Sequence, residues 1–140
     1  MEIWKHALLS SILATLIYPF YGWGVLLILV GGVLIDIDHY LWYMLKYQKF
    51  NLSSCYKHFT IDADKNNYKD VTGTLMIFHT TEFFLLMIVA SFYNRYVFLF
   101  TIGLLGHYLL DFIWHWQVTK RVITDLSVIH WLFKNQIQKL

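Results

Sequence analysis

The chain has 140 residues and one cysteine, enough for a single domain and too few cysteines for an internal disulfide. Hydrophobic residues make up 58% of the chain and charged residues 14%, which excludes the polar surface of an ordinary small soluble domain. The net charge of +2 is too small to indicate a nucleic-acid partner. We therefore expect a surface that faces membrane lipid.

Four apolar stretches predict membrane-spanning helices, at about residues 3–20, 23–47, 71–93 and 96–116. Pro19 with Gly22 and Gly24 predicts a helix break and a tight turn after the first stretch. Asn94 and Arg95 predict the turn between the last two stretches. The predicted fold is all-α: an integral membrane four-helix bundle in a single domain, residues 1–140.

The polar segments predict two further features. Residues 46–70 indicate a polar loop, in which the acidic run 62–67 only weakly resembles a calcium-binding loop. At about residues 122–139 the apolar side chains recur at helical spacing, which predicts a C-terminal amphipathic helix lying on the membrane interface. Packing of that helix on a partner protein is the alternative.

The basic residues are distributed unevenly between the two predicted sides of the membrane. With four spans, the N-terminus, the long loop and the C-terminal tail share one side, and only Arg95 lies on the other. The shared side carries Lys5, Lys46, Lys49, Lys57, Lys65, Lys69, Lys120, Arg121, Lys134 and Lys139. Because loops rich in lysine and arginine usually remain in the cytoplasm, we expect a cytoplasmic (inner) membrane protein with both termini in the cytoplasm.

Ionisable residues inside the predicted spans form the candidate site, because each is costly in lipid and needs a partner or a role. Their positions in alternating spans place them all at a similar depth, towards the cytoplasmic side. They are His6, Asp36, Asp38, His39, His79, His107 and Asp111, with Glu82 as an eighth. This common depth predicts a polar pocket between the helices that opens to the cytoplasm.

Helical spacing indicates that the pocket binds metal. His107 and Asp111 are four residues apart and Asp36 and His39 three apart, so each pair shares a helix face. Asp38 points away on a straight helix, and a helix break near residues 36–39 would bring it in. Histidine with carboxylate ligands suits a divalent ion, with zinc the first expectation and manganese or iron(II) the alternatives.

Other interpretations remain open at this point. The cluster is also compatible with a structural ion-pair network without metal, or with haem between two histidines. His58, His115 and His130 are expected to be hydrogen-bonded packing residues, although His115 continues the face of His107. The glycines at 31, 32, 103 and 106 predict close approach of two helices.

The motifs resemble those of the YdjM-like family of inner-membrane predicted metal-dependent hydrolases. Residues 32–39 (GVLIDIDH) are similar to its Gly-x-x-x-Pro-Asp-x-Asp-His signature, with Ile35 in place of the proline. His6 matches an early histidine, residues 106–111 (GHYLLD) match a His-x-x-x-Asp motif, and His79 lies where the family has a His-Ser dipeptide. The family is distantly related to zinc-dependent phospholipase C and P1-type nucleases, which implies a phosphoester substrate.

These observations predict a membrane-embedded metal-dependent hydrolase acting on a phosphoester or lipid-linked substrate from the cytoplasmic side. The seven His and Asp residues named above would bind the metal, and Asp38 or Glu82 would act as general base where it is not a ligand. The alternatives are a metal- or proton-binding transport protein and a small structural subunit of a membrane complex.

Overall fold

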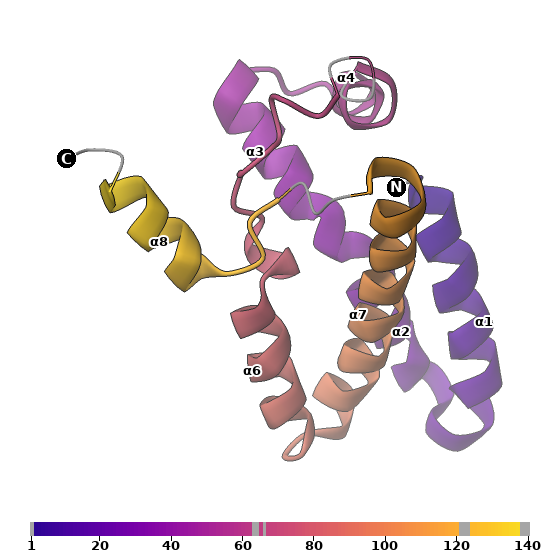
Figure 1. Ribbon diagram of the computed structural model, residues 1–140. Helices are drawn as coiled ribbons and strands as arrows, with labels where there is room; N and C mark the ends of the chain where they lie inside the picture. The colour runs from indigo at the N-terminus through magenta and orange to yellow at the C-terminus, as the bar shows by residue number, and fades with distance from the viewer. Residues whose placement is uncertain (1, 63–64, 66, 121–123, 138–140) are drawn as a thin grey trace.

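The computed structural model describes residues 2–62, 65, 67–120 and 124–137, and the regular structure of this part is helical (Figure 1). The longer helices are α1 (Ile3–Tyr21), α2 (Leu26–Val33), α3 (Ile37–Tyr47), α4 (Leu52–Lys57), α6 (Thr81–Ser91), α7 (Arg95–Trp114) and α8 (Val128–Ile137). Short helical segments are η1 (Gly22–Val25), η2 (Leu34–Asp36), η3 (His58–Asp62), η4 (Ile77–His79) and η5 (His115–Thr119). The predicted all-α class is confirmed.

Two helical stretches, Ile3–Tyr47 and Arg95–Gln117, are long and apolar enough to cross a membrane. The first folds back on itself, so that α1 and α2 lie antiparallel (Figure 1). The helix continues through Pro19, which was predicted to break it, and ends at Gly22. Gly22 has a φ of +53°, a conformation that other residues adopt only with strain.

Helices α2 and α7 cross at close range, as the glycine pattern predicts. A methyl group added to Gly31 would collide with the carbonyl of Phe100, and one added to Gly103 would collide with the carbonyl of Ile28. Small residues allow such backbone contact between apolar helices. Beside the crossing, α1 completes a buried cluster formed by Ala14, Val25, Ile28 and Leu99.

The second predicted span is broken in the middle. The 3₁₀ turn η2 separates α2 from α3, and α3 leaves the bundle at an angle (Figure 1). Asp36 ends this turn and Asp38 lies in the first turn of α3. The break at residues 34–36 is close to the one at 36–39 that the sequence required for Asp38 to join the other polar groups.

The third predicted span, 71–93, is much shorter in the structure. Helix α6 begins only at Thr81, where the hydroxyl of Thr80 accepts a hydrogen bond from the Phe83 N–H at 3.3 Å. The preceding N–H of Phe78 donates instead to the carboxylate of Asp38, at 3.1 Å. The first turns of the predicted helix are therefore absent, because Thr80 caps α6 and the backbone before it contacts Asp38 of α3.

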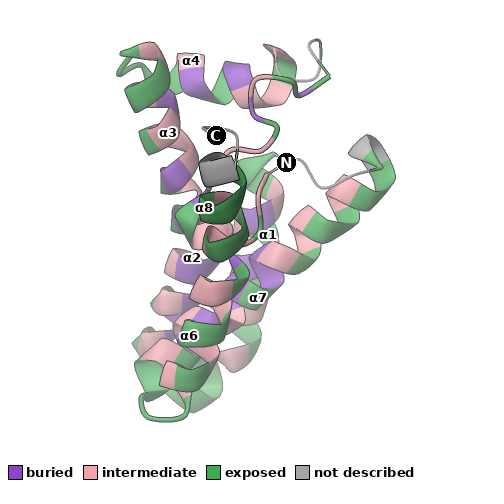
Figure 2. Ribbon diagram, turned by 60° about the vertical axis from the view of Figure 1, so that its left-hand side comes forward, coloured by how far each residue is buried: buried purple, intermediate pink, exposed green. Residues whose placement is uncertain are grey.

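The outer faces of the bundle are apolar and exposed (Figure 2). On α1 the exposed side chains Leu8, Ile12, Leu16 and Phe20 follow one another every four residues along the helix. Soluble monomers rarely expose continuous apolar surfaces of this kind, whereas lipid-facing helices do.

The predicted polar loop and tail both contain helices. The side chain of Asn51 caps α4 by accepting a hydrogen bond from the Ser54 N–H at 3.0 Å, and Cys55 is the buried residue of this helix. The C-terminal helix predicted at about 122–139 is present as α8 from Val128, and residues 124–127, which were predicted to be helical, are not. Its expected residues 122–123 and 138–139 lie outside the described part. The carbonyl of Leu126 just before α8 accepts a hydrogen bond from the Thr81 N–H at 2.7 Å.

Candidate metal centre

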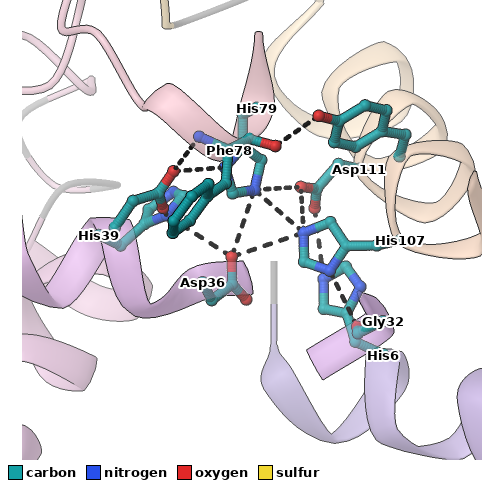
Figure 3. A network of polar contacts seen from close by, with 10 residues as sticks. His6, Gly32, Asp36, His39, Phe78, His79, His107 and Asp111 are labelled. Atoms are coloured by element: carbon teal, nitrogen blue, oxygen red, sulfur yellow. Dashed lines mark hydrogen bonds and ion pairs between the residues drawn. The ribbon is translucent and has the colours of Figure 1, made fainter. Parts of the chain in front are cut away.

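The predicted His and Asp residues come together from five elements, near the start of α1 and the end of α7 (Figure 3). His6 comes from the first turns of α1, and His79 comes from η4. The η2–α3 junction supplies Asp36, Asp38 and His39, and the last turns of α7 supply His107 and Asp111. The seven residues form three overlapping groups, each of which has ligand atoms close enough to share one ion.

The tightest arrangement consists of four atoms from three elements. The Nε2 atoms of His79 and His107 are 3.1 Å apart. Asp36 Oδ1 lies 3.4 Å from the His79 nitrogen and 3.5 Å from the His107 nitrogen. Asp111 Oδ2 lies 3.7 Å from the first and 3.1 Å from the second. We call these residues, Asp36, His79, His107 and Asp111, the four-donor set.

Hydrogen bonds on the far side of each imidazole indicate which nitrogen carries the proton. His107 Nδ1 donates to the carbonyl of Gly32 at 3.0 Å, and His79 Nδ1 lies 3.0 Å from Asp38 Oδ2. In the neutral rings both Nε2 atoms then present lone pairs to each other and to two carboxylate oxygens. Such atoms repel one another unless a cation or a proton lies between them.

Five of the six separations within the four-donor set are close to those around a small divalent cation. Zinc binds histidine nitrogen and carboxylate oxygen at about 2.0–2.2 Å, and a tetrahedron with bonds of that length has edges of about 3.3–3.6 Å. The two Nε2 atoms are 3.1 Å apart, and each carboxylate oxygen lies 3.1–3.7 Å from both of them, which brackets this edge. The Asp38 contact to His79 also resembles the carboxylate–histidine pairs that orient metal ligands in proteins.

The remaining predicted ligands flank the four-donor set on two sides. On one side the buried His6 stacks on His107 with ring centroids 3.8 Å apart, and its Nε2 lies 3.4 Å from Asp111 Oδ1. On the other side His39 Nδ1 lies 2.7 Å from Asp38 Oδ1 and 3.5 Å from Asp36 Oδ1. His6 Nδ1 is buried and has no hydrogen-bond partner among the described residues.

Glu82 lies in a different environment. Its carboxylate accepts hydrogen bonds from the Ser127 hydroxyl at 2.6 Å and from the N–H groups of Val128 and Ile129 at 3.2 and 3.3 Å. It therefore caps the N-terminus of α8, and it belongs to none of the three groups that bring ligand atoms together. This position does not support the general-base role that the sequence indicated for it.

The other histidines are placed apart from the four-donor set. His58 is buried against the rings of Tyr43 and Tyr47, and the exposed His130 pairs with Asp125 at 3.3 Å. His115 lies on the wall of a cavity of about 490 Å³, which is also lined by four members of the cluster: Asp36, His39, His79 and Asp111. The cavity gives the metal-binding groups one accessible side.

Several participants could not be identified from the sequence. The carbonyl of Gly32 and the N–H of Phe78 are backbone groups, and no residue type marks them in advance. Tyr108 donates to the carbonyl of Phe78 and so holds the segment that carries His79. Its only sequence signal is its position beside His107.

No protein-family model, curated protein sequence or solved structure matches the chain. Arguments about function therefore depend on the geometry of the cluster and its cavity.

Proposed function

We propose that the chain is a membrane-embedded metal-dependent hydrolase that acts on a phosphoester or lipid-linked substrate from the cytoplasmic side. The observation that carries the proposal is the convergence of two carboxylate oxygens on two Nε2 lone pairs, with each oxygen 3.1–3.7 Å from both nitrogens. Such a donor set suits zinc, with manganese or iron(II) as alternatives. The resemblance to the YdjM-like family agrees with this assignment.

Each side chain of the cluster has a proposed part in the reaction. A divalent ion bound by the four-donor set supplies Lewis-acid activation of water and of the scissile bond. Asp38 holds the His79 ring in the orientation that presents Nε2. His39, with Nδ1 directed to Asp38 and one side on the cavity, is positioned to accept a proton from the attacking water. This replaces Glu82 as the candidate base.

The alternative of transport receives less support. A route across the membrane needs polar groups beyond the cluster, towards the η1 turn. The packed region there is the apolar cluster of Ala14, Val25, Ile28 and Leu99, joined by Leu13, Ile17, Leu27 and Ile102. A site open at one end and sealed by apolar packing at the other fits a reaction centre better than a channel.

Membrane insertion with four spans and cytoplasmic termini is part of the same proposal. The two long apolar stretches and the exposed apolar face of α1 support insertion. Both the α1–α2 turn and the α6–α7 turn lie at the end opposite α4 (Figure 1). The second turn leads to Arg95, whereas Lys5, Lys46 and Lys57 belong to the start of α1, the end of α3 and α4. This distribution of described basic residues supports cytoplasmic termini by the positive-inside rule.

Metal content, measured by elemental mass spectrometry on detergent-purified protein, tests the proposal. We expect near-stoichiometric zinc, manganese or iron in the wild type, and its loss in His107→Ala and Asp36→Ala. His130→Ala is the matched control, because this exposed histidine pairs with Asp125 away from the cluster. The metal-bearing protein is then assayed for hydrolysis of phosphoester lipids. Folded protein that holds no metal, and takes none up on addition, would refute the proposal.

A further inference from the structure

The cavity beside the four-donor set has a polar floor and mainly apolar walls. Where Asp36, His79 and Asp111 reach it, the surface is polar. The walls are mainly aromatic and aliphatic, and they come from α3, α4, η3, the turn segment before η4 and the end of α7. They include Tyr40, Tyr56, Phe59, Val71 and Trp114. A cavity of about 490 Å³ with this lining suits an apolar group more than a sugar or a nucleotide.

The rim of the cavity is also apolar. Ile3 at the start of α1 is 43% exposed, and Leu52 and Tyr56 on α4 are 67% and 46% exposed, and all three line the opening. In a helix bundle that stands in lipid, such a rim allows an acyl or alkyl chain to enter without crossing a polar surface. The cavity therefore favours a ligand that comes from the membrane over one that comes from water.

The charged residues around the cavity limit the negative charge that the polar group of a ligand can carry. No lysine or arginine is among the described residues that line it. The nearby Lys5 pairs with Glu2 at 2.8 Å, and Lys46 donates to the carbonyl of Asp70 at 2.7 Å. A cation held by Asp36 and Asp111 has both of its charges balanced by these carboxylates. Two negative charges on a ligand would then lack compensation.

We infer that the cavity takes the apolar chain of an amphiphilic ester whose polar group carries no more than one negative charge. This inference rests on the proposed hydrolase function and narrows its substrate class: doubly charged phosphomonoesters and diphosphates are excluded. The chain lies against the aromatic walls, and the ester group reaches the four-donor set on the cavity floor.

Binding of three small probes to protein in lipid nanodiscs tests the inference by calorimetry at pH 8. Methyl octyl phosphate has a chain and one charge, octyl phosphate has a chain and two charges, and dimethyl phosphate has one charge and no chain. We expect the first probe to bind at least about tenfold more tightly than either of the others. For the chain, tenfold corresponds to roughly two buried methylene groups.

A cavity-blocking variant separates binding in the cavity from partition into lipid. Ser53 is exposed on α4 and lines the cavity, so Ser53→Trp fills the opening without disturbing a buried position. Lys57→Trp is the control, because Lys57 is exposed on the same helix and does not line the cavity. We expect Ser53→Trp to lose at least tenfold in affinity for methyl octyl phosphate and Lys57→Trp to match the wild type.

The zinc content of each sample distinguishes the two ways of failing. Zinc-loaded wild-type protein that binds octyl phosphate as well as methyl octyl phosphate, or that is unaffected by Ser53→Trp, would overturn the inference and leave the metal site intact. Protein that holds no zinc, manganese or iron, and takes none up on addition, would refute the proposed function itself, whatever the probes do.

Discussion

Asp38 offers the sharpest test of how the cluster is organised, because the sequence indicated a metal ligand and the geometry indicates a positioning residue. One carboxylate oxygen faces His79 Nδ1 at 3.0 Å and the Phe78 N–H at 3.1 Å, and the other faces His39 at 2.7 Å. Asparagine at this position keeps an acceptor for Phe78 and loses the negative charge that orients the two imidazoles. We therefore expect Asp38→Asn to fold and to bind zinc more weakly.

The expected loss of zinc affinity in Asp38→Asn follows from the role of Asp38 as a residue that orients a ligand. Removal of a carboxylate that orients a metal-bound histidine lowers metal affinity by roughly 10–100-fold, or about 1.4–2.7 kcal/mol. Removal of a direct ligand in Asp36→Asn should cost more than this. Competition with a chromophoric zinc chelator measures both values. Asp125→Asn is the control, because that carboxylate pairs with Lys134 outside the cluster.

Two results would refute this reasoning about Asp38. An affinity loss as large as that of Asp36→Asn would make Asp38 a ligand. An affinity equal to that of the wild type would show that His79 needs no orientation by a carboxylate.

Three further predictions concern the surrounding structure. Gly103→Ala should lower the free energy of unfolding by about 1–3 kcal/mol, measured with denaturant, because the added methyl group collides with the backbone of α2. Gly106→Ala should lower it less, because its methyl group meets leucine side chains. Equal losses in the two variants would contradict the close crossing of α2 and α7. Burial raises the pKa of the Cys55 thiol from 9.0 to about 11, which lowers the thiolate fraction at pH 8 on the order of 100-fold. Iodoacetamide should thus label the folded protein far more slowly than the denatured one, as followed by mass spectrometry, and equal rates would refute the burial. Glu82→Gln should weaken the cap of α8 and speed amide exchange at Val128 and Ile129, because the charged acceptor of these N–H groups is lost, and metal content should not change. Loss of metal in this variant would show that Glu82 belongs to the metal site.

The parts of the fold that follow from helical periodicity were predictable from the sequence. The long apolar runs predicted the bounds of α1 and α7 to within two residues, and the glycines at 31 and 103 predicted that α2 and α7 pack closely. The shortening of the third span was not predictable, because it depends on Phe78 donating to Asp38, 40 residues away in the chain. Helix α4 was missed because its apolar residues are few, although Asn51 is a recognisable cap.

In the candidate site too, the features set by the order of the helices were predictable, and those set by tertiary contacts were not. The sequence placed seven ionisable residues at a common depth, since alternating span direction is a property of the order of the helices. It could not separate Asp38 from Asp36, because both lie near the break and only tertiary contacts distinguish their partners. It also included Glu82 because of its depth in the third predicted span, whereas Glu82 instead meets a helix that begins 46 residues later.

The break between α2 and α3 has a consequence for how deep the cluster lies in the proposed membrane placement. His6 is three residues from the start of α1, and His107 and Asp111 are seven and three residues from the end of α7, so the cluster lies about 5–10 Å from the ends of these helices. The hydrocarbon core is about 30 Å across, a length that α1 and α7 match. In the proposed membrane placement the cluster and the break thus lie near the cytoplasmic interface. Non-helical backbone is tolerated at that depth only beside protein or water, and His107 meets this requirement by donating to the carbonyl of Gly32.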